Sequence, residues 1–266
     1  MYRSLELREQ LYVDVCNLRD KGFSYARIIE QIRQTHGTLL AKSNISDWVN
    51  GNHEPLGKVH YFTAKATPQL AYIIGVRFGD LTLWANQKIH NYRMILRAID
   101  KEFVEEFNRC VSFVLKCREH SIGWDEERYW RVEIQSVMMY RFLSQPFRLL
   151  KKYVEHCGKC AAAFLRGFFD SEGSISGRNL VAYNTLLSIL RYAARLLKTR
   201  FGIETGKTSL SHPAGTRRII NDVLCVSRKD CYVVRVKACG LDLFQKHVNF
   251  TIRRKVNALE SACRKG

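Results

Sequence analysis

The chain has 266 residues, and its 43 lysines and arginines outnumber its 25 aspartates and glutamates, which gives a net charge of +18. Hydrophobic residues make up 46% of the sequence, enough for one large domain or two to three small ones. The charge favours a polyanionic partner, most often nucleic acid, over a protein that is merely basic. The first residues are charged rather than signal-like, and no apolar run is long enough to span a membrane, so we expect an intracellular, cytoplasmic protein.

The nine cysteines are expected to be reduced and structural. One C-x-x-C pair is present, at Cys157 and Cys160. A zinc site would need a second pair at suitable spacing, and the sequence has none. We therefore favour a structural role for all nine.

Residues 1–57 are predicted to form a separate small domain. The segment 5–22 has the pattern of an amphipathic helix that stops at Gly22. A second helix is expected between an N-cap at Ser24 and a stop at Gly37.

A third helix is predicted with Ser43 as its N-cap and Ile45, Trp48 and Val49 as its apolar stripe. Three short helices with a polar third one are typical of a helix-turn-helix, although a small bundle that binds protein, or nothing, remains an alternative. The stretch "FSYARIIEQI…SNISDWVNG" resembles the helix-turn-helix of resolvase-like and transposase-like DNA binders. The candidate DNA contacts in it are Ser43, Asn44, Ser46 and Asn50.

A linker is predicted at 52–68, and beyond it the sequence repeats. Segment 70–81 aligns with segment 161–173, and small residues in the two segments stand 92 positions apart. The pairs are Ala71 and Ala163, Gly75 and Gly167, and Gly79 and Ser171. An acid follows each stripe, Asp80 in the first and Glu172 in the second, again 92 positions apart.

The rest of the sequence alternates between strand and helix patterns. Strands are predicted at 91–99, 128–135 and 231–239, and helices at 100–116, 143–156, 185–202 and 240–248. This order indicates an α+β fold whose sheets have one polar, often basic face. The candidate DNA contacts from the sheets are Arg93, Arg97, Arg131, Gln135, Arg178 and Arg235.

The paired acids suggest a metal site. Stripes of small residues allow two helices to pack with their backbones close together, which would bring Asp80 and Glu172 side by side. Adjacent carboxylates repel and raise one another's pKa unless a cation neutralises them. Mg²⁺ is commonly held by such a pair, and two-metal sites of this kind hydrolyse phosphodiesters in many nucleases. The alternative is two unrelated helix ends with solvated acids.

At these residues the chain resembles the LAGLIDADG homing endonucleases, in particular single-chain, two-motif enzymes of the archaeal-intron type. "AYIIGVRFGDL" resembles the first motif, "FLRGFFDSEGSIS" the second, and the tail 241–259 the C-terminal helix of that family. The resemblance covers about residues 60–266. It implies two αββαββα repeats, at 58–158 and 159–266, which form a pseudo-dimer in a monomeric chain. It further implies that the motif helices form the interface and the sheets a saddle over double-stranded DNA.

In this resemblance Asp80 and Glu172 are the catalytic, metal-binding acids, with two or more Mg²⁺ ions near them. The family often places a lysine late on a strand, where Lys237 stands in the second half and Ile99 in the first. Leu81 also departs from the pattern, because the family usually has glycine after the first acid. We therefore expect a Mg²⁺-dependent endonuclease with a long asymmetric site in which Lys237 assists catalysis.

Two other functions remain open. A relative that has lost cleavage could act as a regulator or as a maturase that binds intron RNA. A recombinase or transposase is suggested only by residues 1–57, and the rest of the sequence has no catalytic domain of that kind.

Overall fold

A computed structural model describes residues 4–52, 62–89, 91–220 and 223–264. Most of the linker predicted at 52–68 lies outside these residues. The chain divides into two compact units, of which the smaller holds residues 1–61 with the short segments 85–92 and 135–138, and the larger holds the remainder. In the described part of the chain, no helix combines the length and the apolar character that a membrane span requires.

Three helices make up the N-terminal region: α1 (Leu5–Asp20), α2 (Tyr25–His36) and α3 (Lys42–Val49). The Ser24 hydroxyl accepts a hydrogen bond from the Arg27 amide, and Gly37 ends α2 in the left-handed conformation, as predicted. The N-cap predicted at Ser43 is wrong. The helix begins at Lys42, and its N-cap, two residues before Ser43, is Ala41, whose methyl side chain cannot accept a capping hydrogen bond.

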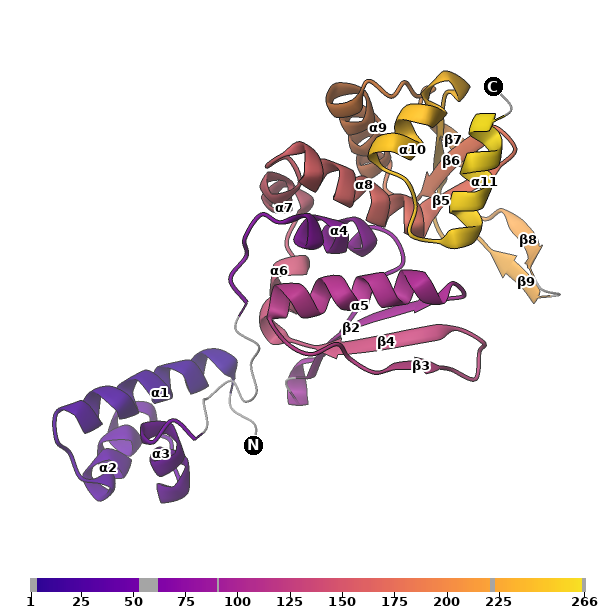
Figure 1. Ribbon diagram of the computed structural model, residues 1–266. Coiled ribbons are helices and arrows are strands. Elements are labelled where there is room, and N and C mark those ends of the chain that lie inside the picture. Colours follow the sequence, from indigo (N-terminus) through magenta and orange to yellow (C-terminus); the bar gives the residue numbers. More distant parts are fainter. Residues whose placement is uncertain (1–3, 53–61, 90, 221–222, 265–266) are drawn as a thin grey trace. The chain divides into compact units, whose positions relative to one another are not determined.

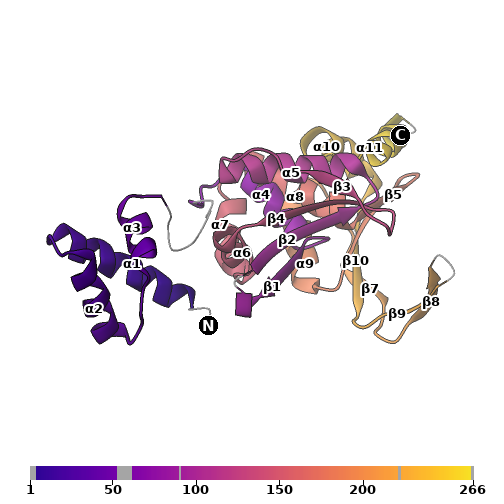
Figure 2. The ribbon, with the colours of Figure 1, turned by 90° about the horizontal axis from the view of Figure 1, so that it is seen from below.

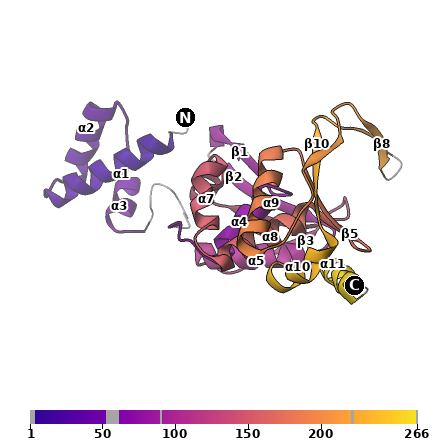
Figure 3. The ribbon, with the colours of Figure 1, turned by 90° about the horizontal axis from the view of Figure 1, so that it is seen from above.

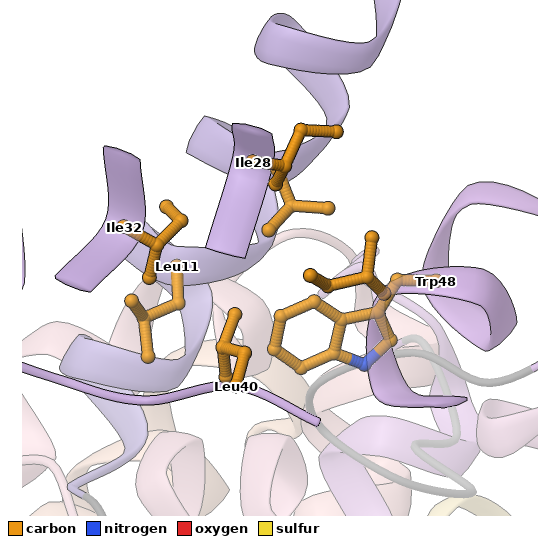
Figure 4. Close-up of a cluster of buried hydrophobic side chains, with 7 residues drawn as sticks. Leu11, Ile28, Ile32, Leu40 and Trp48 are labelled. Carbon is orange, nitrogen blue, oxygen red and sulfur yellow. The ribbon is translucent and has the colours of Figure 1, made fainter. Parts of the chain in front are cut away.

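The core of this region joins all three helices. Leu11 of α1, Ile28 and Ile32 of α2, Leu40 of the segment before α3 and Trp48 of α3 pack together, and Val15 and Ile45 complete the cluster (Figure 4). Because apolar side chains from each helix meet in one cluster, the three helices share a single core.

The other elements follow in two series. The first comprises α4 (Pro68–Arg77), β1 (Thr82–Asn86), β2 (Asn91–Ala98), α5 (Lys101–Leu115), β3 (Ile122–Trp124), β4 (Trp130–Gln135), α6 (Val137–Leu143) and α7 (Phe147–Val154). The second comprises α8 (Gly158–Glu172), β5 (Gly173–Ser176), β6 (Asn179–Asn184), α9 (Leu187–Phe201), β7 (Ser209–His212), β8 (Arg217–Ile220), β9 (Val223–Val226), β10 (Cys231–Val236), α10 (Leu241–His247) and α11 (Arg253–Arg264).

The strands form two four-stranded sheets and one hairpin. The strand order is β1-β2-β4-β3 in the first sheet and β5-β6-β10-β7 in the second, and β8 and β9 form the hairpin. Helix α5 runs along the first sheet (Figures 1 and 2), and α9 packs on β6 and β10 of the second. This arrangement of helices and antiparallel strands confirms the predicted α+β class.

Helices α4 and α8 lie side by side between these layers (Figures 1 and 3). Helix α4 is almost wholly buried and α8 is buried along one side, and their apolar residues form much of the core of the larger unit. The C-terminal helix α11 ties the second series to the first, because the Arg254 guanidinium binds both oxygens of the Asp100 carboxylate, at 2.7 and 2.8 Å.

Candidate metal site at the ends of two helices

Helices α4 and α8 approach most closely at glycines. A Cβ on Gly75 would overlap the carbonyl oxygen of Phe164, and a Cβ on Gly167 would overlap that of Tyr72. Farther along, a Cβ on Gly79 would collide with the side chain of Ser171. Of the other two residues in the predicted stripes, Ala71 is buried and Ala163 half-buried. The backbones can come this close only because side chains are missing at these positions.

The first acid, Asp80, does not lie on a helix. Helix α4 was expected to reach this residue but ends at Arg77, and a turn carries the chain from Phe78 to Asp80. The amide groups of Gly79 and Leu81 both bond to the carbonyl oxygen of Val76, at 3.1 and 3.2 Å. Leu81 is buried, so an apolar anchor fixes the turn where the family resemblance led us to expect glycine.

The second acid, Glu172, is the last residue of α8. Gly173 follows in extended conformation and begins β5, and a Cβ there would overlap the carbonyl oxygen of Phe169. Gly173 pairs with Ala182 of β6, so Asn184 at the end of β6 lies next to Glu172. The Asn184 amide donates to the Glu172 carboxylate (3.1 Å) and to the carbonyl oxygen of Phe78 (2.7 Å), which links the ends of the two helices.

The two carboxyl groups influence each other. Both side chains reach solvent, yet the protein around them removes part of their hydration. This desolvation raises the pKa of Asp80 to about 6 and that of Glu172 to about 8. The charge of Asp80 is the second cause of the raised pKa of Glu172. Neither acid forms an ion pair with any residue that the structure describes. Closely placed oxygen donors without a bonded cation suit a hard divalent ion.

The other acid of the second motif, Asp170, has a different role. It is 2% exposed and accepts hydrogen bonds from the Tyr72 hydroxyl (2.9 Å) and the Thr251 amide (2.8 Å). Burial raises its pKa, while these bonds oppose the rise. Asp170 therefore joins α8 to α4 and to the segment between α10 and α11.

Lys255 is a residue of the site that sequence reasoning missed. Its ammonium group, buried in the core, donates to the carbonyl oxygens of Phe169 (3.2 Å) and Asp170 (2.6 Å) at the end of α8. Burial lowers its pKa to about 8, and its charge lowers the pKa of both Asp80 and Glu172. A signal was present, because Lys255 shares an i, i+4, i+7 stripe of α11 with the buried Leu259 and Ala262.

The basic residues of the first sheet are already paired with acids. Arg97 binds Asp125 and Glu127, with a distance of 2.8 Å from its Nε to the Asp125 carboxylate. Arg93 and Arg131 share Glu133, at 2.7 and 2.6 Å. The predicted face is therefore polar but largely neutralised.

The predicted DNA contacts elsewhere in the sheets are exposed and, among the residues that the structure describes, not neutralised by acids. Arg235 of β10 and Arg178 of the β5–β6 turn are exposed and form no ion pair with a described residue, and Gln135 is exposed at the end of β4. Arg178 lies in a turn rather than on a strand.

Lys237 lies just outside the strand that was expected to carry it. Strand β10 ends at Val236 instead of residue 239, because the Lys237 amide turns to bond the carbonyl oxygen of Glu204 (2.9 Å). The Lys237 side chain is exposed. Ile99, at the position that corresponds to it by count in the first half, is 67% exposed.

The predicted contacts of the N-terminal region lie on and just after α3. Ser43, Asn44 and Asn50 are exposed, and Ser46 is half-buried. Asn50 donates a hydrogen bond to the Ser46 hydroxyl (3.2 Å), so these two side chains support each other.

Comparison with known proteins agrees with this fold. The model of a LAGLIDADG-like domain matches residues 159–249. The chain is 30% identical over 256 residues to an uncharacterized protein, MJ0398, of Methanocaldococcus jannaschii, which covers 92% of this chain and 90% of that protein. A second protein of the same organism, MJ0314, is 30% identical over 110 residues, 40% of this chain and 41% of its own length.

Solved structures with a similar fold include the homing endonuclease I-DmoI. Its complex with DNA and Ca superposes with a TM-score of 0.55 at 15% identity, covering 74% of this chain and 99% of that one. A structure of mesophilic variants of I-DmoI gives a TM-score of 0.52 at 15% identity, covering 68% of this chain and 95% of that one. At this identity the likeness shows a common fold.

Proposed function

We propose that this chain, which belongs to the same protein family as MJ0398 of Methanocaldococcus jannaschii, is a site-specific endonuclease of double-stranded DNA. The observation that carries the proposal is the convergence of Asp80 and Glu172, with raised pKa values, at the ends of two helices in contact. The LAGLIDADG-like fold and the net charge of +18 support it.

The two halves are proposed to be pseudo-symmetric repeats. Gly75 and Tyr72 of the first half correspond, 92 positions later, to Gly167 and Phe164 of the second. Gly75 contacts Phe164 and Gly167 contacts Tyr72, so each half makes the same contact with the other. The strand orders also correspond, with the β8–β9 hairpin as an addition to the second half. Such symmetry would place one sheet on each half of a long, asymmetric DNA site.

The residues fit a hard divalent cation, and we propose Mg²⁺. Asp80 and Glu172 would hold it, and when bound it supplies the positive charge that polarises a phosphate and activates a water. Asn184 fixes the orientation of Glu172, and Lys255 favours the ionised form of both acids. Lys237 would place a positive charge near the phosphate, and Arg178, Arg235 and the α3 residues would contact DNA.

One observation favours a second candidate, a relative that binds DNA or RNA without cutting. Helix α8 continues through Glu172, whereas α4 ends three residues before Asp80, and the first half has an exposed Ile99 where the second has Lys237. The two acids therefore differ in the backbone that positions them, a helix for Glu172 and a turn for Asp80. A chain with this asymmetry could keep the scaffold and lose the chemistry.

Cleavage of a plasmid that carries the DNA flanking the protein's own reading frame separates these functions. We expect wild-type protein with Mg²⁺ to linearise it, and EDTA to stop the reaction. Glu172→Gln and Asp80→Asn should each slow cleavage by about 100-fold or more, the loss that follows removal of a key electrostatic group, while DNA binding in a gel-shift assay persists.

The control is Asp242→Asn, which changes an exposed acid of α10 and should cut normally. If wild-type protein binds this DNA but never cuts it, the binding-only function holds instead. Cleavage by Glu172→Gln at the wild-type rate would refute the assignment of the acid.

A further inference from the structure

Three side chains with soft ligand atoms lie together at the start of α8. His156, Cys157 and Cys160 each offer one ligand atom, a ring nitrogen or a sulfur, and these three atoms all lie within 4.8 Å of one another. The two sulfurs are 3.5 Å apart. No role of these residues in DNA cleavage follows from the site described above.

The local fold explains why the sulfurs meet. Cys157 is the N-cap of α8, and its Sγ accepts a hydrogen bond from the Cys160 amide (3.4 Å). Cys160 lies one turn along on the same face of the helix and is completely buried. His156 directly precedes the cap and is exposed, while Cys157 is half-buried. The cluster therefore has a closed side in the core and an open side toward solvent.

The distances fit two thiolates that share one ion. In a tetrahedral site with zinc–sulfur bonds of about 2.3 Å, two ligating sulfurs stand about 3.8 Å apart. The sulfurs of a disulfide are only about 2.05 Å apart. The separation of 3.5 Å is close to the first value and far from the second. A second C-x-x-C pair, which the sequence lacks, would not be needed, because His156 offers a third ligand atom.

We propose that His156, Cys157 and Cys160 bind a divalent cation of the Zn²⁺ class, with the fourth position open to water. Two thiolates balance the charge of such an ion, and sulfur and imidazole select it over Mg²⁺. The site is distinct from the acids, because the 15 residues of α8 separate it from Glu172 by about 20 Å at 1.5 Å per residue. A bound ion would fasten the chain before α8 to the first turn of that helix.

Cobalt substitution tests the proposal directly. The full-length, reduced, metal-free protein is titrated with Co²⁺, and we expect the sulfur-to-cobalt charge-transfer band and the intense visible bands of a tetrahedral site, saturating at one ion per chain. Zn²⁺ should abolish these bands by displacement. Mg²⁺ in excess should not.

Variants locate the site. Cys157→Ser should lose the charge-transfer band, and His156→Ala should weaken Co²⁺ binding, since both residues reach solvent and their replacement leaves the core intact. Cys225→Ser and Cys239→Ser, at two exposed cysteines elsewhere, are the matched controls and should keep the band. Asp80→Asn should keep it as well, which makes this result independent of DNA cleavage.

Thermal unfolding gives a second measurement. One equivalent of Zn²⁺ should raise the melting temperature of the wild type and not that of Cys157→Ser. The proposal is overturned if the reduced wild type shows no charge-transfer band, or if Cys157→Ser keeps it. Isolation of the protein with a Cys157–Cys160 disulfide that binds no metal after reduction would also overturn it.

Discussion

Two acids only two residues apart in α8 have opposite environments. Asp170 is enclosed and bonded to Tyr72 and Thr251, whereas Glu172 reaches solvent and shares its surroundings with Asp80. An acid near the C-terminal end of a helix is destabilised by the helix dipole. The ammonium group of Lys255 at the same helix end offsets this, because it binds the last buried carbonyl groups and lowers the pKa of both acids of the site.

The pKa values predict how stability depends on pH without a metal. Glu172 has a raised pKa of about 8 against an ordinary 4.5, so between these values the folded state binds more protons than the unfolded one and the free energy of unfolding falls as pH rises. Asp80 acts in the same direction up to about pH 6. In EDTA, we expect Glu172→Gln to flatten this decline and to be more stable than wild type at pH 8 by about 1 to 3 kcal/mol.

Urea unfolding at pH 5 and pH 8 measures this effect. Addition of Mg²⁺ at pH 8 should recover stability in the wild type and much less in the variant. A wild type whose stability in EDTA is the same at both pH values would contradict the raised pKa of Glu172.

At the scale of elements, the contact between α4 and α8 depends on missing side chains. Gly75→Ala and Gly167→Ala should each destabilise the protein by about 1 to 3 kcal/mol or more, since the new methyl group overlaps a backbone carbonyl that cannot rotate away. Gly158→Ala, in the first turn of α8, is the matched control, because nothing lies within 4 Å of its Cβ position. Thermal or urea unfolding of the three variants distinguishes these effects. Equal stability of Gly75→Ala and Gly158→Ala would show that the helices do not pack this closely.

The sequence predicted most of the helices, but among the ten strands that the structure describes it placed only β2, β4 and β10, and several ends were wrong. Strand alternation and helix periodicity predicted β2, β4, α5 and α9 to within a few residues, because burial follows period 2 or 3.6 in each. The end of α4 was missed, because the turn at Gly79 depends on Leu81 entering a core that other elements build. The early end of β10 has a similar cause, since the Lys237 amide bonds to Glu204, far away in the sequence.

In the candidate site, too, some residues could be predicted from the sequence and others could not. The acids could be proposed from a pattern repeated within the chain, and their roles remain proposals. Asn184 could not be assigned, and the apolar stripe of α11 could indicate only that Lys255 is buried, because each acts through a partner that only the tertiary fold brings near. The same holds for Arg97, which reads as a free basic residue until Asp125 and Glu127 fold against it.

At the scale of the whole molecule, the arrangement of charge matters more than its sum. With about ten phosphates neutralised, the slope of log affinity against log salt should be near −9. Arg235→Ala should reduce this slope by about 1, whereas Arg97→Ala should reduce it less, because Arg97 is already paired with two acids. Fluorescence anisotropy with labelled target DNA at several salt concentrations measures both. A larger change for Arg97→Ala than for Arg235→Ala would show that DNA displaces the ion pairs of the first sheet.

The glycine contacts between α4 and α8 also affect how this chain could be recombined with others. At Gly75 and Gly167 the nearest atoms of the opposite helix are backbone carbonyl oxygens, which every residue type provides. At these two contacts the interface makes little demand on side-chain identity, whereas the hydrogen bond from the Tyr72 hydroxyl to Asp170 requires a matched pair. A half taken from a related chain, with its own sheet and its own DNA preference, should dock on α4 or α8 as long as its glycines keep register and the partner of Tyr72 or Asp170 is retained. Each half could in this sense be exchanged as a unit. A library of such fusions could be screened for folded proteins before any is tested on DNA.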